Sequence, residues 1–117
     1  MPRSYSYTRM IKLSRGDMSL LRAGKKTCTI RLGDASVPVP EIEMSDGRTS
    51  VRVRITSVDN KRTLGELTDD DARAEGFATR EELLLDLRKY YPSVAAADQV
   101  TVISFQPITG TGTLFGI

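Results

Sequence analysis

The chain has 117 residues, of which 39% are hydrophobic and 27% are charged, so its size and composition are those of one soluble globular domain. It has no histidine, no tryptophan and one cysteine, which excludes serine–histidine and cysteine–histidine catalysis and an internal disulfide, and leaves too few ligands for a structural zinc site. Residues 1–32 hold eight basic residues and one acidic residue, a charge of +7, whereas the rest holds nine basic and fourteen acidic residues, a charge of −5.

This uneven charge leaves two interpretations open. A basic face would suit a phosphate-bearing partner, whereas folding could also mix the charges over the surface. No apolar run approaches the roughly 18 residues that span a bilayer, and residues 1–15 lack the apolar stretch of a secretory signal. With a single cysteine, which fits a reducing compartment, these absences predict a cytoplasmic protein with no membrane partner.

In chain order, the first predicted elements are a short strand over residues 10–13 and a short helix capped by Asp17. Gly24 is expected to end this helix in the left-handed conformation. Residues 27–32 then predict a strand with two faces. The apolar face carries Cys28, Ile30 and Leu32, and the polar face carries Thr27, Thr29 and Arg31.

The middle of the chain predicts a hairpin. Residues 39–44 favour an edge strand, and Asp46-Gly47 is a strong turn signal. Residues 51–56 alternate between apolar and polar side chains, as in a strand with one buried face.

Two helices and a closing strand follow. Thr68 is expected to cap a helix over residues 69–75 that ends at Gly76. Thr79 and Glu82 form the pattern of a capping box, which predicts a helix that continues to about residue 91. Its apolar stripe would contain Leu83, Leu84, Leu87, Tyr90 and Tyr91. Residues 99–105 predict the last strand, before a tail rich in glycine and threonine.

This order of elements predicts an α+β fold, and the alternating strands favour an open or closed barrel. No internal repeat or linker divides the chain. We therefore expect a single domain over residues 1–117, with its core at about residues 10–106 and an extra C-terminal tail at residues 107–117.

Residues 24–31 are the first candidate site. A glycine turn followed by a strand places lysine, threonine and arginine side chains at the rim of a sheet, where they can hold a carbonyl oxygen or a phosphate. A solvated basic turn is the simpler alternative. Glu75 is a second candidate, because a carboxylate near a helix C-terminus lies in an unfavourable field. Cys28, on the apolar face of its strand, is expected to be a buried hydrophobe and not a nucleophile.

Several segments together resemble the ASCH domain, a member of the PUA-like superfamily. Residues 21–31 (LRAGKKTCTIR) are similar to the glycine–lysine–threonine–arginine motif of the family. Residues 67–72 (LTDDDA) with residues 75–77 (EGF) are similar to its second block, and residues 91–92 and 100–105 to its closing helix and strand. The resemblance covers about residues 10–106; residues 33–47 and the tail depart from it.

The resemblance implies a β-barrel of about five to six strands flanked by two to three short helices, with a cleft that faces the first motif. It also implies RNA or a modified nucleoside as the ligand. One bacterial branch with similar motifs consists of small amidohydrolases that remove the acetyl group from N(4)-acetylcytidine. Their catalytic lysine, threonine and glutamate fall on Lys26, Thr29 and Glu75. Gly24, Lys25, Thr27 and Arg31 would then bind substrate.

The expected chemistry is amide hydrolysis without a cofactor or metal, and two versions remain open. In one, Thr29 is the nucleophile, a neutral Lys26 takes its proton, and Glu75 protonates the leaving amine or activates the deacylating water. In the other, a charged Lys26 stabilises the oxyanion and Glu75 activates water.

Three other functions compete with this hypothesis. The first is an RNA- or nucleotide-binding module without catalysis, and the second is a ribonuclease that uses Lys26 and Glu75. The third is an interaction domain that keeps only the fold. We expect a monomer or a weak homodimer in each case.

Overall fold

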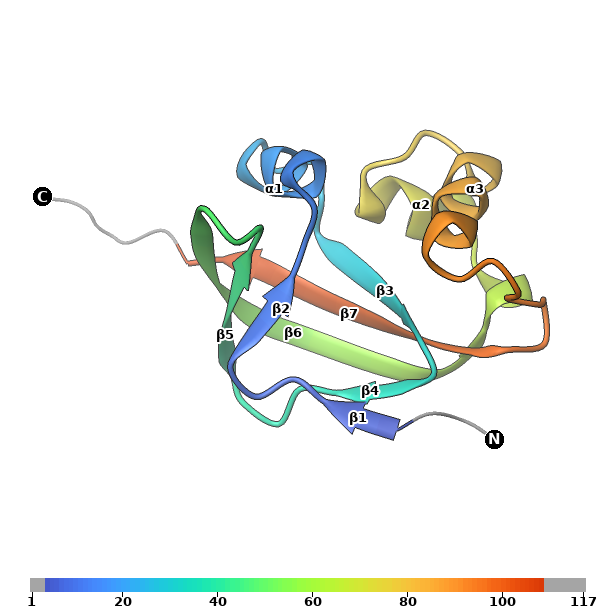
Figure 1. Cartoon of the computed structure of the whole chain (residues 1–117), viewed down its shortest axis with the longest axis horizontal. Helices are drawn as coiled ribbons and strands as arrows, with labels where there is room; N and C mark the ends of the chain where they lie inside the picture. Colours follow the sequence, from blue (N-terminus) through green and yellow to red (C-terminus); the bar gives the residue numbers. More distant parts are fainter. Residues whose placement is uncertain (1–3, 109–117) are drawn as a thin grey trace, which may run out of the picture.

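Most of the strands form one mixed sheet, and two short strands pair beside it (Figure 1). The computed structural model describes residues 4–108. The five-stranded sheet has the order β2-β5-β6-β7-β3, with β2 and β5 parallel and the other neighbours antiparallel. Its strands are β2 (Met10–Lys12), β3 (Cys28–Leu32), β5 (Glu41–Ser45), β6 (Ser50–Thr63) and β7 (Gln99–Pro107). The two-stranded parallel sheet pairs β1 (Ser4–Ser6) with β4 (Asp34–Ser36).

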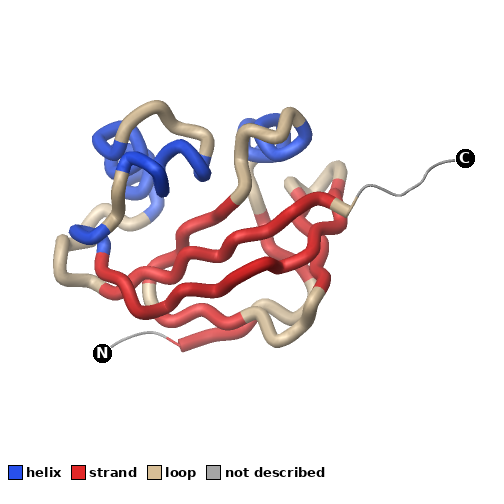
Figure 2. The backbone as a smooth tube through the Cα atoms, turned by 180° about the vertical axis from the view of Figure 1, so that it is seen from behind, coloured by secondary structure: helices blue, strands red, loops and turns tan. Residues whose placement is uncertain are grey.

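The helices lie on one side of the strands, as the front and back views agree (Figures 1 and 2). They are α1 (Arg15–Arg22), α2 (Asp69–Glu75) and α3 (Arg80–Tyr90), with a single 3-10 turn at Leu64–Glu66. The predicted α+β class is therefore confirmed. The described strands form a five-stranded and a two-stranded sheet, and the larger sheet keeps free edges at β2 and β3, so a single closed barrel is not formed by these residues.

Three details of the strands differ from the prediction. β1 and β4 were not expected, because each has only three residues and polar composition. β5 is not an edge strand, because β2 pairs with its outer side. β6 extends to Thr63, well beyond the predicted end at residue 56, and bulges interrupt its pairing with β7. The predicted tail at residues 107–117 lies outside the described residues from residue 109 onward.

The helix ends follow capping chemistry, with two corrections. α1 begins earlier than predicted, because the Ser14 hydroxyl accepts from Asp17 N–H at 3.1 Å and is the true cap. Thr68 caps α2 as predicted. Thr79 caps α3, but the Glu82 carboxylate accepts from Ala78 N–H at 3.0 Å, so the capping box is incomplete.

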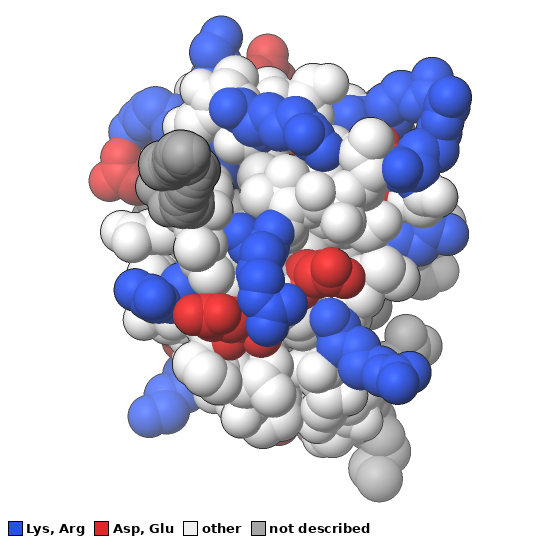
Figure 3. Space-filling view, turned by 90° about the vertical axis from the view of Figure 1, so that its left-hand side faces the viewer, with Lys and Arg blue, Asp and Glu red and all other residues white. Residues whose placement is uncertain are grey.

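The surface mixes the two signs of charge on the face that carries the β5–β6 hairpin. Figure 3 shows Lys and Arg side chains there with Asp and Glu side chains between them. Glu41, for example, lies 3.4 Å from both Arg52 and Arg54. This face therefore carries charges of both signs and is not uniformly basic.

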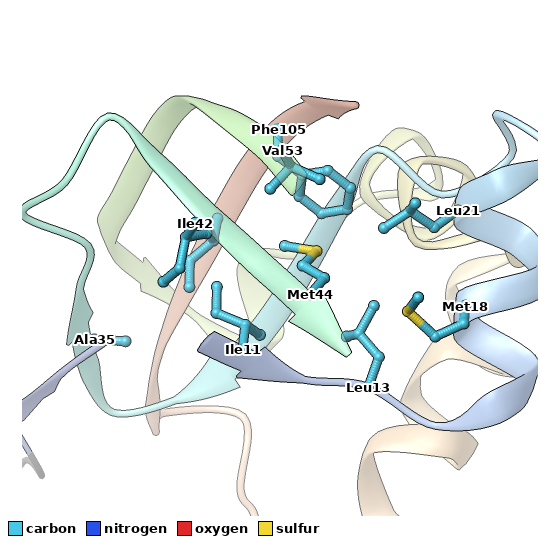
Figure 4. Close-up of a cluster of buried hydrophobic side chains, with 10 residues drawn as sticks. Ile11, Leu13, Met18, Leu21, Ala35, Ile42, Met44, Val53 and Phe105 are labelled. Carbon is cyan, nitrogen blue, oxygen red and sulfur yellow. The ribbon is translucent and has the colours of Figure 1, made fainter. Parts of the chain in front are cut away.

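The core has two parts. The first lies between α1 and the strands, where Met18 and Leu21 point toward Leu13 and Met44 (Figure 4). The second packs α2 and α3 against β3 and β7, and contains Cys28, Ile30, Leu64, Leu67, Ala72, Leu83, Leu87, Val100 and Val102. Cys28 and Ile30 thus lie on the apolar face of β3, as predicted. Tyr90 is 60% exposed and does not belong to the buried stripe of α3.

The turn after α2 requires glycine. Gly76 has φ +104°, and a Cβ atom there would lie 2.8 Å from Leu20 Cδ1. We expect Gly76→Ala to lower the free energy of unfolding by about 1–3 kcal/mol, measured by urea denaturation. Gly24→Ala is the matched control, since Gly24 has φ +75° but nothing within 4 Å of its Cβ position. A Gly76→Ala protein as stable as Gly24→Ala would show that the contact with Leu20 has no cost.

Candidate active site

A lysine and a glutamate meet in the interior, where α2 ends above the turn that precedes β3. Lys26 is 1% exposed and Glu75 is 6% exposed. Lys26 Nζ donates to Glu75 Oε1, and Ile30 N–H donates to Glu75 Oε2 at 2.8 Å. Both carboxylate oxygens are therefore bound. Burying such a pair costs desolvation energy that the attraction between the charges does not always recover, so stability alone does not explain it.

Backbone contacts of the turn place Lys26 under Glu75. The left-handed Gly24 reverses the chain after α1. Thr27 N–H then donates to Ala74 O at 2.6 Å, and Thr27 O accepts from Phe105 N–H at 3.0 Å. Thr27 therefore ties the turn to both α2 and β7, which brings Lys26 and the last residue of α2 together.

Burial makes the charged form of Glu75 less favourable than it is in water. Burial raises the pKa of Glu75, although Lys26 and the Ile30 N–H oppose this shift. The negative end of the α2 dipole acts in the same direction as burial. A carboxyl with a raised pKa beside an ammonium group can share one proton with it, which is an arrangement suited to acid–base chemistry.

A small cleft of about 100 Å³ opens beside Glu75. Thr29 and Arg31 of β3 line it, together with residues at the start of α1 and in the last turns of α3. Thr29 is only 3% exposed, and within residues 4–108 its hydroxyl makes no hydrogen bond. The cleft therefore presents a free hydroxyl next to a buried acid–base pair.

Arg31 offers hydrogen-bond donors to the same cleft. Its Nη2 donates to Lys12 O at 2.9 Å, and its guanidinium lies 5.8 Å from the centre of the Tyr7 ring. Its Nε is buried and has no partner among the described residues. A buried N–H without a partner is costly, so a ligand oxygen that accepts from it would be bound favourably.

The structure does not bring all the predicted binding residues together. Gly24, Lys25 and Thr27 line a separate, shallow depression with Arg73 and Phe77. Lys26 does not line the cleft itself and reaches it through Glu75. Of the residues predicted to bind substrate, only Arg31 lies in the cleft.

Three further residues in the cleft were not predicted as functional. Asp17 was interpreted only as a helix cap and Tyr90 only as part of an apolar stripe, and Asp86 carried no sequence signal. Their spacing gives no indication of a site, because α1 and α3 come to the same cleft only in the folded chain.

Cys28 is not part of this chemistry. Its side chain is 1% exposed and belongs to the second part of the core. Burial raises the pKa of the Cys28 thiol to about 12, so the reactive thiolate is scarce at neutral pH.

Two absences hold for the residues that the structure describes. None of the helices there combines the length and the apolar character that crossing a membrane requires. In residues 4–108, no three His, Cys, Asp or Glu side chains are grouped as metal ligands.

Comparison with known proteins defines the fold. The ASCH domain from Lactobacillus crispatus JV V101 superposes with a TM-score of 0.67 and 16% identity, over 89% of this chain and 79% of that one. The chain therefore has the fold of an ASCH domain. The hypothetical protein PH0355 is also similar, with a TM-score of 0.63, 19% identity, and coverage of 91% of this chain and 100% of that one.

Protein EF3133 from Enterococcus faecalis V583 has the same fold, with a TM-score of 0.57, 18% identity, and coverage of 92% of this chain and 80% of that one. The sequence matches no family model, and no curated protein matches it. The likeness is therefore one of fold, and the function has to be argued from the site.

Proposed function

We propose that this protein is a metal-independent amidohydrolase that acts on an acylated modified nucleoside such as N(4)-acetylcytidine. One observation carries the proposal: the buried Lys26–Glu75 pair adjoins a cleft lined by the unpartnered hydroxyl of Thr29. A nucleophile, a base and an acid are the groups that amide hydrolysis needs. The resemblance to the N(4)-acetylcytidine amidohydrolases supplies the substrate class.

The raised pKa of Glu75 supports a mechanism in which the shared proton first moves from Lys26 Nζ to Glu75. Thr29 Oγ1 then attacks the acyl carbon, and its proton passes by way of Glu75 to the neutral Lys26 amine, so that Glu75 stays protonated. Glu75 protonates the leaving nitrogen, so that the C–N bond breaks and an acyl-Thr29 ester remains. Water activated by the Glu75 carboxylate hydrolyses the ester and restores Thr29.

In the other version, Lys26 keeps its proton and stabilises the oxyanion while Glu75 activates water directly. The ion pair in the resting site supports this charge state. Rapid acid quench followed by mass spectrometry separates the two versions. An acyl adduct on Thr29 supports the first, and full activity without any adduct supports the second.

The size and lining of the cleft suit a single base better than a long polymer. Its volume of about 100 Å³ is below the roughly 300–1,000 Å³ of pockets that enclose a drug-sized ligand. Tyr90 offers an aromatic ring at the rim, and the Arg31 guanidinium offers donors for a carbonyl oxygen. A base can enter while its ribose stays outside.

A panel of acylated cytidines tests the proposal. We expect ultraviolet absorbance to report loss of the acetyl group from N(4)-acetylcytidine, at the same rate with and without a chelator. Labelled RNA is incubated in parallel. Cutting of that RNA would favour a ribonuclease, and salt-sensitive RNA retention without any turnover would favour a binding module. Either result contradicts the proposal if N(4)-acetylcytidine stays intact. A hydrolysis rate that falls when the chelator is added contradicts the metal-free mechanism.

A further inference from the structure

Two carboxylates that the proposed mechanism does not use face the cleft. Asp17 comes from the first turn of α1, and Asp86 comes from α3. Both are half-buried. Among the described residues, neither carboxylate accepts a hydrogen bond. Asp86 forms one ion pair there, with Lys89 at 4.0 Å, and the charge of Lys26 also acts on it.

These two carboxylates also act on each other. Burial raises the pKa of Asp86, and the charge of Asp17 raises it further. Asp17 likewise contributes to the raised pKa of Glu75. Acidic side chains gathered without hydrogen-bond donors are destabilising, unless a bound ligand provides the donors.

The opposite kind of group comes from the strands. Lys12 of β2 and Arg31 of β3 line the same cleft, and the buried Arg31 Nε has no partner in the described part of the chain. Thr29, a residue that is only 3% exposed, also lines the cleft, and its side chain has no hydrogen-bond partner there. These unpartnered polar groups indicate that the cleft suits a polar ligand.

Hydrogen-bond acceptors from the helices and donors from the strands therefore line the same cleft. A ligand that matches this lining carries both N–H donors and oxygen acceptors. The pairing edge of cytosine has this pattern, with an amino donor at one end and a carbonyl acceptor at the other. Uracil has a carbonyl oxygen where cytosine has the amino group, so an ionised carboxylate would repel it.

We propose that Asp17 and Asp86 are specificity-determining residues that accept hydrogen bonds from the exocyclic N–H of the base, while Arg31 binds its carbonyl oxygen, so that the cleft selects cytosine-type over uracil-type nucleosides. This inference rests on the proposed function, which supplies the substrate class. Selectivity for the base is nevertheless separable from hydrolysis, because binding can be measured with nucleosides that carry no acyl group.

The test is isothermal titration of the full chain with cytidine and with uridine. We expect the wild type to bind cytidine about 10-fold or more tightly than uridine. Asp86→Asn keeps the shape but replaces an acceptor with an amide that can also donate, so the preference should fall to about 3-fold or less. Asp17→Asn should lower it in the same direction, and the matched control Asp70→Asn, on the exposed surface of α2, should keep it.

The outcomes separate this inference from the proposed function. Three results overturn the inference, even if N(4)-acetylcytidine is hydrolysed. The wild type binds cytidine and uridine equally, it binds neither, or both cleft variants keep the wild-type preference for cytidine. A cytidine preference that both variants lose supports the inference, even if the wild type leaves N(4)-acetylcytidine intact and the proposed function fails.

Discussion

Thr29→Val is expected to lower kcat/KM for N(4)-acetylcytidine by at least about 1,000-fold while the fold stays intact. Valine has nearly the same shape as threonine but lacks the nucleophilic oxygen. Since the Thr29 hydroxyl has no hydrogen-bond partner in residues 4–108, its removal leaves no unsatisfied group behind. The free energy of unfolding should therefore change by less than about 1 kcal/mol, measured by urea denaturation alongside the absorbance assay.

Two variants serve as controls for this result. Thr29→Ser keeps a hydroxyl and should retain measurable turnover. Thr101→Val removes another buried hydroxyl, which accepts from Ala35 N–H at 2.9 Å and donates to Gly33 O at 2.7 Å. We expect Thr101→Val to cost about 1–3 kcal/mol of stability but little activity. Wild-type kcat/KM in Thr29→Val would rule out Thr29 as the nucleophile.

Lys26→Met is expected to cost about 3–5 kcal/mol of stability at neutral pH, because it leaves the Glu75 carboxylate buried without its cation. Burial already raises the pKa of Glu75 in the folded wild type, so the folded state binds its proton more tightly than the unfolded state. The contribution of Glu75 to the stability of the variant should therefore be fully present below the ordinary pKa of a glutamate and should be lost as the pH rises through the raised value. Urea denaturation at several pH values measures this.

Glu75→Gln completes a double-mutant cycle. Because glutamine carries no charge and still has an oxygen that can accept from Ile30 N–H, the Lys26→Met/Glu75→Gln protein should be more stable than Lys26→Met alone at neutral pH. Additive losses in the double variant would show that the two side chains are not coupled. Recovery of stability in the double variant would show that the fold does not require the charged pair. This would support a chemical reason for the presence of Lys26 and Glu75.

Elements with a strong local signal could be predicted from the sequence. The alternation around Val53, the turn at Asp46-Gly47 and the Thr68 cap depend on neighbours within a few residues, and each is found in the structure. The two short strands β1 and β4 could not be predicted in this way. Each is three residues long, and they pair with each other from distant positions in the chain, as Tyr5 does with Ala35.

The site shows the same division between local and distant information. Composition left carboxylates, lysine, threonine, serine, tyrosine and the single cysteine as the available chemistry, and the family resemblance named Lys26, Thr29 and Glu75. The ion pair joins residues 49 positions apart in the sequence, and its burial follows from backbone contacts of Thr27 that no pattern encodes. Asp86 was missed for this reason, since its place in the cleft depends on how the fold brings α3 and α1 to the same cleft.

The most direct test of the proposed hydrolysis is a single-turnover reaction with the protein in excess over N(4)-acetylcytidine, comparing the wild type with Glu75→Gln. We expect complete loss of the acetyl group with the wild type, and a rate lower by about 100- to 10,000-fold with the variant, whose amide cannot transfer the proton. Equal rates for the two proteins, or no reaction with the wild type, would contradict it.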